Sequence, residues 1–533
     1  MQKLYYGGSI ITLEEENEGA EALLVENGLI KYVGPLETAI EMSKDPEKIC
    51  LNGRTLIPAF IDAHSHFTWV AKSAQGVSLQ DAESFSDIVE LLTKYISENK
   101  PTKESVIFGY CYDNTVLKEK KHPTKNILNQ VSTEIPIYIN HVSMHMGCAN
   151  DAALAICGID QTTPDPQGGM IGRVEGTLEP NGYLEEIASM QALAKLTSEI
   201  KIDPFFALTK AQEIYSENGI TTVQDGASND QIINLLKNFS SNNLLKIDVV
   251  AYPLIKDSFP EIIKQNPEYV HKYKNRLRIG GCKLMLDGSP QAKTAWLTKP
   301  YENSGDYCAY PILKDEEVFE YTKATIDENL QVLAHCNGDA TSDQFISNYK
   351  KALMQSNNPN KENLRPVMIH CQTVRDDQLD EMVKLQMLPS IFVGHTYYWG
   401  DVHMENLGIE RGRRISPAKS ALDRGLCINL HQDSPVTKPL MLHSMWCAVN
   451  RISRSGKVIG PEQCIDVYDA LKAVTINAAF AYFEESIKGS LKAGKLADLV
   501  ILDKNPLTVD KMEIKDIRVL ETIKEGNTIW KLV

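Results

Sequence analysis

The apolar positions of this chain divide it into two short β-rich ends and a long middle in which two periodicities alternate. Near the N-terminus, strand-like pieces cover residues 3–6, 9–13, 22–26 and 29–33, and similar pieces return at 498–502, 517–522 and 528–530. Turn signals such as Asn27-Gly28 and Gly526-Asn527 separate some of them. Because the two ends match in length and alternation, we expect them to meet in one small β-sandwich domain, formed by residues 1–55 and 487–533.

Between residues 62 and 430, apolar strand-like runs alternate with amphipathic helical stretches. The runs lie at 106–110, 135–139, 220–223, 246–251, 278–286, 331–334, 366–369 and 427–430. Helices are expected at 86–98, 203–218, 315–329 and 376–385, and a further helical stretch at 467–485. Repeated βα units of this kind are typical of an α/β protein with a parallel sheet. Their number favours a (β/α)8 TIM-like barrel with insertions over residues 56–486.

Composition and charge restrict the possible partners. The 533 residues include 43% hydrophobic and 23% charged residues, as expected of a soluble globular enzyme. The net charge of −15, with no basic stretch, argues against nucleic acid. No run approaches the roughly 18 apolar residues of a membrane span, and the N-terminus lacks a secretion signal, so we expect no membrane contact and a cytoplasmic location. The eleven cysteines have no paired spacing, which favours buried thiols over a disulfide framework.

The strongest candidate for chemistry is the point where the apolar run 56–63 ends in His64-Ser65-His66. Alternate side chains of a strand point the same way, so the two imidazoles project together from one strand end. Neutral imidazole is a good ligand for zinc and similar ions, so the pair makes half of a catalytic metal site. The alternative is two polar residues leaving a strand for solvent.

Other polar residues follow or interrupt apolar runs in the predicted barrel. Lys283 lies inside such a run, where an unpaired ammonium is costly. Runs also end in His335, in His370, and in His431 with Asp433. The carboxyl ends of barrel strands are where such residues form a site. Taken singly, each histidine is more often a packing residue than a ligand, and the alternative for the lysine is an ion pair with Asp287 or Asp225.

In this order, the residues resemble metal-dependent hydrolases of the amidohydrolase superfamily, in the family 3 type branch that includes N-substituted formamide deformylases. The similarity covers nearly the whole chain, and the matched segments are 58–66, Lys283 with Asp287-Gly288, His335 with Gly338-Asp339, His370, 433–435, and the tail 489–502. Each piece alone is short, but the ordered set is specific.

The resemblance implies a ligand set for one or two divalent ions, with zinc as the expected metal. These ligands are His64, His66 and Asp433 at a more buried ion, His335 and His370 at a more exposed one, and Lys283, carboxylated on its side-chain nitrogen, between them. A carbamate is anionic and offers one oxygen to each ion, which also explains how a buried lysine is tolerated.

The activity implied by the resemblance is hydrolysis of a non-peptide, amide-like carbon–nitrogen bond in a small molecule by a metal-activated water. Asp433 is expected to act as general base and then acid. His395 is expected to steady the developing oxyanion. His145 resembles a family position near the substrate. Tyr398 is expected to line the substrate pocket, with packing as the alternative, and His431 to contact the substrate, with a hydrogen bond that supports a metal ligand as the alternative.

Two further readings stay open. One is a catalytically silent barrel that serves as a scaffold or regulator, because a fold does not by itself imply an activity. The other is a related deaminase, which uses the same water chemistry with one metal and no bridging lysine. The substrate and the assembly are open as well, with a homodimer as the expectation.

Overall fold

The computed structural model describes residues 2–15, 19–73, 76–142, 146–166, 169–198, 204–255 and 260–532. The chain has an α/β fold and divides into two compact units. The first contains Met1–Phe67, Gln212–Ser434 and Lys438–Val533, and the second contains Thr68–Ala211 and Pro435–Thr437.

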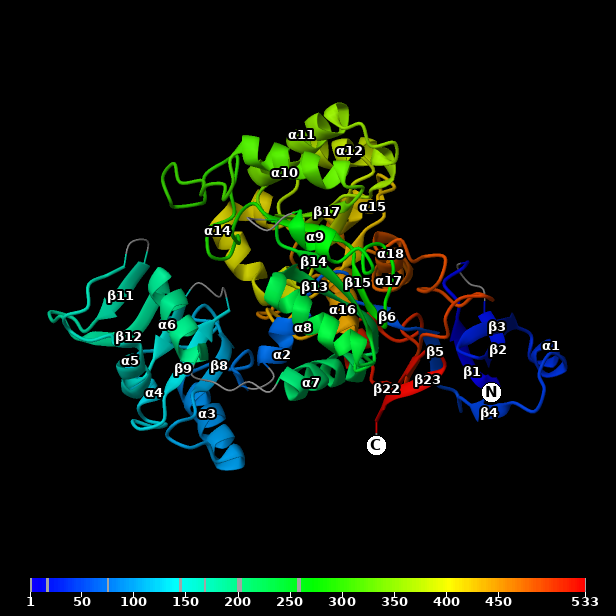
Figure 1. Cartoon of the computed structure of the whole chain (residues 1–533), viewed down its shortest axis with the longest axis horizontal. Coiled ribbons are helices and arrows are strands. Elements are labelled where there is room, and N and C mark those ends of the chain that lie inside the picture. The colour runs from blue at the N-terminus through cyan, green and yellow to red at the C-terminus, as the bar shows by residue number, and fades with distance from the viewer. Residues whose placement is uncertain are drawn as a thin grey trace. The chain divides into compact units, whose positions relative to one another are not determined.

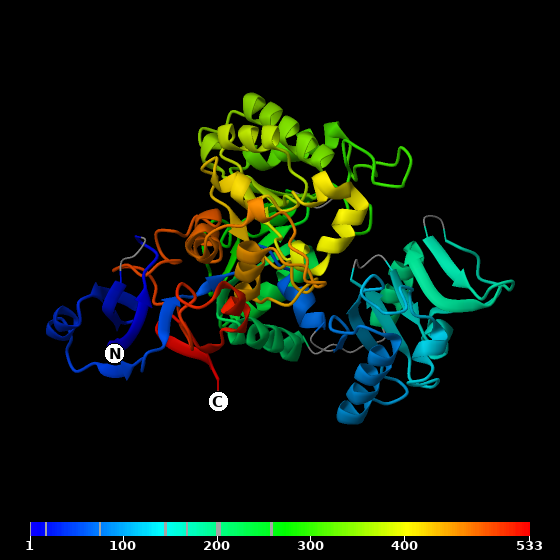
Figure 2. The ribbon, with the colours of Figure 1, turned by 180° about the vertical axis from the view of Figure 1, so that it is seen from behind.

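Strands from both ends of the chain form one eight-stranded sheet in the first unit. Its order is β23-β22-β21-β5-β1-β2-β3, with β4 beside β1. The strands are β1 (Gln2–Ile11), β2 (Gly19–Glu26), β3 (Leu29–Gly34), β4 (Glu47–Cys50), β5 (Thr55–Pro58), β21 (Leu499–Leu502), β22 (Val519–Lys524) and β23 (Asn527–Lys531). The two ends join where β5 pairs antiparallel with β21 and Leu56 lies opposite Ile501 (Figures 1 and 2).

An apolar cluster explains why the two ends stay together. Leu23 and Leu56 from the N-terminal segment are buried in it with Leu499 and Ile523 from the C-terminal segment. Burying each such side chain contributes roughly 1.5–3 kcal/mol. The expected meeting of the two ends is therefore present in this sheet. Helix α1 (Leu36–Glu41) and the 3-10 helix η3 (Lys511–Asp516) accompany it.

The site-bearing strands of the first unit are all parallel. They form two sheets, β15-β14-β13-β6 and β16-β17-β18-β19-β20. Their bounds are β6 (Phe60–Ile61), β13 (Ile220–Ser228), β14 (Asp248–Pro253), β15 (Leu277–Ile279), β16 (Gly281–Met285), β17 (Gln331–Cys336), β18 (Val367–His370), β19 (Leu388–Ile391) and β20 (Asn429–Leu430).

The expected single strand at 278–286 is interrupted between β15 and β16. Gly280 lies at the interruption, where a Cβ would come within 2.5 Å of the Tyr252 ring. Beyond it, Lys283 forms a parallel bridge with Leu254, so β16 continues alongside the end of β14. The glycine therefore permits the close approach that brings Lys283 to its place.

Helices connect these strands in βα fashion. Those expected at 203–218, 315–329 and 376–385 are present as α7 (Pro204–Glu217), α10 (Asp315–Asp327) and α12 (Asp376–Lys384). The stretch expected at 467–485 is instead two helices, α17 (Val467–Ala473) and α18 (Ile476–Ala481), because Thr475 leaves the helical region. Helices α10, α11 and α12 lie on one side of β17 (Figure 1). The remaining helices are α8 (Asp230–Ser241), α9 (Glu261–Gln265), α11 (Asp339–Gln355), α13 (His395–Tyr398), α14 (Gly400–Gly412), α15 (Ala418–Leu422), α16 (Met441–Asn450), η1 (Lys361–Asn363) and η2 (Pro461–Gln463).

The second unit has its own six-stranded sheet, in the order β11-β12-β10-β9-β8-β7. Two runs expected among the barrel strands, 106–110 and 135–139, are β8 and β9 of this sheet, which corrects that expectation. An apolar run shows that a strand is buried but not which sheet it joins. The elements are β7 (Val77–Ser78), β8 (Ile107–Tyr112), β9 (Ile137–His141), β10 (Met146–Ala149), β11 (Gly169–Arg173), β12 (Pro180–Glu186), α3 (Phe85–Asn99), α4 (Lys125–Leu128), α5 (Asp151–Cys157) and α6 (Ile187–Ser198), and α2 (Phe67–Ser73) leads into it.

Within the described residues, no helix is both long and apolar enough to cross a bilayer. All eleven cysteines are free thiols.

Candidate metal centre

His64 lies in the loop that follows β6, and the side-chain amide of Gln224 holds it in place. Its Nδ1 lies 2.5 Å from Oε1 of Gln224. The Gln224 amide nitrogen donates to the Ala63 carbonyl at 2.9 Å and to the Tyr482 hydroxyl at 3.1 Å, which leaves Oε1 as the acceptor. Nδ1 of His64 therefore carries the ring proton, and Nε2 presents its lone pair.

Asp433 brings a carboxylate to both histidines of the first motif. Its Oδ1 lies 3.4 Å from Nε2 of His64 and 3.2 Å from Nε2 of His66. His64, His370 and Asp433 each offer one ligand atom, and these three atoms lie within 4.8 Å of one another. Three donors that converge from positions far apart in the chain are the arrangement expected of a metal centre.

The backbone is strained at two of these donors. His370 has φ of 78° and Asp433 has φ of 54°, in the left-handed region that non-glycine residues seldom adopt. Strain of this kind costs of order 1–3 kcal/mol and persists where the surrounding structure holds it, typically at functional sites. Both residues lie at or after the ends of parallel strands, and the strained backbone turns their side chains toward each other and toward His64.

Lys283 lies in β16 with a relative exposure of 1%. Its Nζ is 3.2 Å from Nε2 of His64, while Asp287, one of its expected partners, is bonded to His335 instead. Burial lowers the pKa of Lys283 to about 7, against the opposing effect of Asp433. Lys283 therefore lies next to the donor cluster and does not contact Asp287 in preference to it.

His335 is anchored by Asp287. Its Nδ1 lies 3.1 Å from Oδ1 of Asp287. The same carboxylate accepts the backbone N–H of Gly338 at 2.7 Å and the Thr341 hydroxyl at 2.8 Å. Asp287 is thus fixed from several sides, and it orients His335 so that its ring lies 4.4 Å from that of His370.

His431 contacts His370 and also lies beside His64, with the ring centroids 5.2 Å apart. Its Nε2 is 3.3 Å from Nδ1 of His370, and its Nδ1 is 2.9 Å from the Ser390 hydroxyl. It is fully buried. This chain of contacts supports His370 from outside the donor cluster, and the expected substrate contact of His431 stays a prediction.

His395 and Tyr398 lie at the two ends of α13. His395 is buried between the rings of Phe392 and Trp399, at 4.7 Å and 4.6 Å. Tyr398 is partly buried, with its ring 5.6 Å from that of His443. His145, also expected near the substrate, lies outside the described residues.

The buried imidazoles of His64 and His370 are neutral. Burial, ahead of the nearby Lys283, holds the pKa of His64 well below its usual range. Burial, ahead of His335, does the same for His370. Neutral imidazoles next to a carboxylate present lone pairs and negative charge to one space, and a divalent cation fits such a donor set.

Sequence reasoning missed the residues that hold the ligands. Gln224 lies in the middle of β13 and Ser390 in β19, and His403 is fully buried against His395. Asp287 was expected as an alternative ion-pair partner of Lys283, not as the residue that orients His335. No local pattern marks Gln224, Ser390 or His403, because each acts on a residue of another element.

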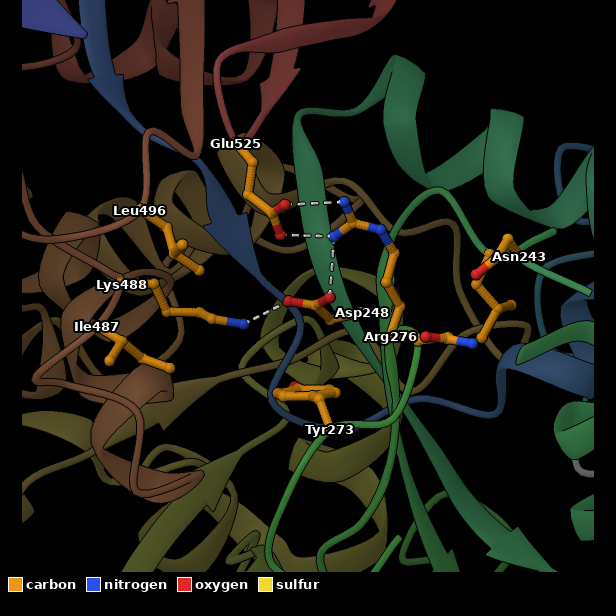
Figure 3. Close-up of a pocket in the computed structure, with 10 residues that line it drawn as sticks. Asn243, Asp248, Tyr273, Arg276, Ile487, Lys488, Leu496 and Glu525 are labelled. Carbon is orange, nitrogen blue, oxygen red and sulfur yellow. Dashed lines mark hydrogen bonds and ion pairs between the residues drawn. The ribbon is translucent and has the colours of Figure 1, made fainter. Parts of the chain in front are cut away.

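A separate cavity of about 410 Å³ lies at the amino ends of β14 and β15. Figure 3 shows its charged lining: Asp248 between Lys488, at 2.6 Å, and Arg276, which also reaches Glu525 at 2.8 Å. Lys524 lies at the end of β22, and its Nζ is 2.6 Å from the Asp248 carboxylate. These charges pair with one another, so the cavity borders an ion-pair network that joins the terminal sheet to the parallel strands.

The fold and the donor set define an α/β protein built to hold a divalent cation. The chain belongs to the amidohydrolase family, whose model matches residues 48–530. It is therefore a hydrolase by class, in the branch that the sequence indicated.

Two curated relatives and one solved structure illustrate the similarity. The N-substituted formamide deformylase of Arthrobacter pascens is 25% identical over 540 residues, 97% of this chain and 96% of that protein. Protein LONG AFTER FAR-RED 3 of Arabidopsis thaliana is 26% identical over 518 residues, 94% of this chain and 87% of that protein. The crystal structure of an uncharacterized metal-dependent hydrolase from Pyrococcus horikoshii OT3 has a TM-score of 0.77 at 25% identity, covering 96% of this chain and 99% of that chain.

Proposed function

We propose that this protein is a metal-dependent amidohydrolase that cleaves a non-peptide, amide-like carbon–nitrogen bond in a small molecule. The observation that carries the proposal is the convergence of His64, His370 and Asp433, whose ligand atoms lie within 4.8 Å of one another. Family membership and the similarity to a formamide deformylase and to a metal-dependent hydrolase support it.

The proposed architecture follows the sequence expectation, with one change. The parallel strands close into a (β/α)8 barrel over residues 56–486, and the terminal sheet forms a β-sandwich from residues 1–55 and 487–533. The second unit is then an insertion between β6 and β13, which pair with each other directly. Ligands at the carboxyl ends of barrel strands are the usual arrangement in this fold.

In this proposal one or two divalent ions, zinc first, are held by the three converging donors together with His66, His335 and a carboxylated Lys283. Such an ion supplies Lewis acidity, which makes water acidic enough to attack at neutral pH and polarises a carbonyl. Asp287 accepts a hydrogen bond from the Nδ1–H of His335, so Nε2 of His335 is the nitrogen available as a ligand. Carboxylation changes Lys283 from an ammonium, which repels a cation, into an anionic oxygen donor.

The chain's own residues then carry the proton and the substrate. Asp433 takes the proton of the attacking water on a carboxylate oxygen and returns it to the leaving nitrogen, a role worth roughly 10² to 10⁴ in rate. His395 donates a hydrogen bond to the substrate oxygen. Tyr398 and His145 contact the rest of the substrate. A cytoplasmic homodimer stays the prediction for the protein as a whole.

Metal analysis combined with a substrate panel tests the proposal. The protein is purified without added metal, its bound metal is quantified, and turnover is measured with linear N-acyl amides, N-substituted formamides and cyclic amides. Bound zinc together with turnover of at least one amide is expected. Negligible bound metal together with no turnover would remove the hydrolase and support the silent scaffold instead.

A variant at Lys283 separates the amidohydrolase from a deaminase. If the lysine bridges the ions, Lys283→Ala loses both metal and amide turnover. In a deaminase-type centre the same variant keeps its ion. The matched control is Lys293→Ala, which changes a lysine outside the donor cluster.

A further inference from the structure

His403 is a buried histidine that the proposed chemistry does not use. It lies in α14, has no exposed surface, and its Nε2 is 3.0 Å from Nδ1 of His395. The two rings are nearly parallel, with centroids 5.2 Å apart and an interplanar angle of 12°. The backbone N–H of His403 donates to the Trp399 carbonyl at 2.8 Å, which closes the first turn of α14 on the residue that also ends α13. The contact between the two imidazoles is therefore part of a rigid arrangement.

The hydrogen bond between the two rings has two possible directions. Burial lowers the pKa of His403 to about 3, and burial ahead of His403 lowers that of His395 well below its usual range, so both rings are neutral. Each neutral ring carries one N–H, and one ring must donate while the other accepts. Which ring donates decides which nitrogen of His395 carries the proton.

The other nitrogen of His403 distinguishes the two directions. Within the described part of the chain, Nδ1 of His403 is buried and has no hydrogen-bond partner. If His395 donated, His403 would carry its proton on Nδ1, as a buried donor without an acceptor. If His403 donates from Nε2, its Nδ1 bears only a lone pair. Buried N–H groups without a partner are rarer in proteins than buried acceptors without one. The geometry therefore favours His403 as the donor.

We propose that His403 is a positioning residue that fixes His395 as the Nε2–H tautomer. His395 then offers a hydrogen-bond donor to a substrate oxygen and has no basic nitrogen free to compete with Asp433 for the proton of water. The proposal rests on the proposed hydrolytic function for the meaning of this donor, but the tautomer itself is a property of the folded chain.

The surroundings of His395 make its tautomer consequential. Its ring is enclosed by Phe392, Trp399 and His403. Asp433, His431 and His335 lie near enough to act on it electrostatically. A buried donor held by packed rings does not have to reorganise when charge develops on a nearby oxygen. This is the condition for effective stabilisation of an oxyanion.

The direct test is the nitrogen spectrum of His395. Protein labelled with ¹⁵N-histidine has 12 histidines, and His395 is assigned by the signals lost in His395→Gln. Long-range ¹⁵N–¹H correlation distinguishes a protonated Nε2 from a protonated Nδ1. We expect Nε2–H in the wild-type protein, with and without zinc. A spectrum with Nδ1–H overturns the proposal.

Two variants test the link between His403 and the chemistry. His403→Gln keeps an amide donor close to the position of Nε2, whereas His403→Leu removes it. We expect His403→Leu to show a mixture of tautomers at His395 and to lose about 10- to 100-fold in kcat with little change in KM. His403→Gln keeps the Nε2–H tautomer and stays within about 5-fold of the wild-type kcat. The control is His271→Asn, an exposed histidine of the same unit.

The outcomes separate this inference from the proposed function. Unchanged tautomer and unchanged kcat in His403→Leu overturn the inference while leaving the hydrolase intact. Absence of turnover in the wild-type protein, with His395 as Nε2–H, removes the hydrolase and leaves the positioning role supported. In the double variant His395→Gln with His403→Leu, the losses should not add, because both act through one ring. If His403→Leu does not fold, the wild-type spectrum and His403→Gln still decide.

Discussion

The side-chain oxygen of Gln224 lies 2.5 Å from Nδ1 of His64, and the two donor bonds of its amide leave that oxygen no alternative orientation. A glutamine on β13 thus decides which nitrogen of a histidine after β6 faces the donor cluster. The orientation of His64 is set from outside its own loop, because the neighbouring strand β13 supplies the acceptor that fixes its ring.

Replacing this glutamine should weaken metal binding. Gln224→Leu keeps the volume but leaves Nδ1 of His64 without its acceptor, so we expect zinc affinity to fall about 10- to 100-fold. Competition with a chromophoric chelator measures the change. Gln331→Leu is the matched control. Gln331 is also buried and hydrogen-bonded, but it lies at the first residue of β17, at the end of that strand away from His335. Equal zinc affinity in Gln224→Leu and the wild-type protein would contradict the assigned role.

Asp287 should be as important to His335 as Gln224 is to His64. Asp287→Asn replaces one acceptor oxygen by an amide donor that meets the N–H of Gly338 or the hydroxyl of Thr341. We expect about 10- to 100-fold weaker zinc binding and a lower kcat. Asp339→Asn serves for comparison, since that carboxylate contacts Thr298 and no histidine. A zinc titration indistinguishable between the two variants would argue against the anchoring of His335.

The ion-pair network at the amino ends of the strands should govern stability but not metal binding. Asp248 is buried between Lys488 and Lys524, and Asp248→Asn removes the carboxylate that they share, so that Lys488 keeps only Glu484 and Lys524 only its other acidic neighbours. We expect a loss of about 3–5 kcal/mol in the free energy of unfolding, measured by urea denaturation.

The control for this network is an exposed ion pair. Asp503 contacts Arg518, whose side chain is 68% exposed, and Asp503→Asn should cost at most about 1 kcal/mol. A loss in Asp248→Asn no larger than in Asp503→Asn would show that the network contributes little. Zinc affinity should be unchanged in both variants.

Stability should depend on pH through His403. Its pKa is lowered by burial to about 3, whereas an unfolded histidine titrates near about 6.5. A lowered folded pKa contributes stability that is present above pH 6.5 and is lost as the pH falls, by about 1.4 kcal/mol per pH unit. The stability advantage of the wild-type protein over His403→Gln should therefore shrink between pH 6.5 and pH 5, measured by urea denaturation with metal content held constant. A gap that stays constant over this range would show that His403 titrates normally in the fold.

The sequence was informative wherever one element carries the whole signal. The alternation at 498–502 and the helical spacing at 315–329 correspond to β21 and α10, because burial of one face dictates each pattern locally. His64, His370 and Asp433 could be found because each follows an apolar run, and the structure brings their ligand atoms together.

The rest depends on contacts between elements that no local pattern records. The runs that became β8 and β9 look like barrel strands because a buried strand is apolar in either sheet. The contact of His403 with His395 depends on the angle between α13 and α14, and neither helix carries a sign of it in its own residues. Supporting residues of this kind become visible only in three dimensions.

β6 pairs directly with β13, although the residues of the second unit lie between the two strands in the sequence. The donors are therefore synthesised at different times. His64 leaves the ribosome early, and Asp433 follows only after most of the polypeptide has been made. A growing chain therefore presents these side chains in sequence order, and the full set exists only once Asp433 has been synthesised.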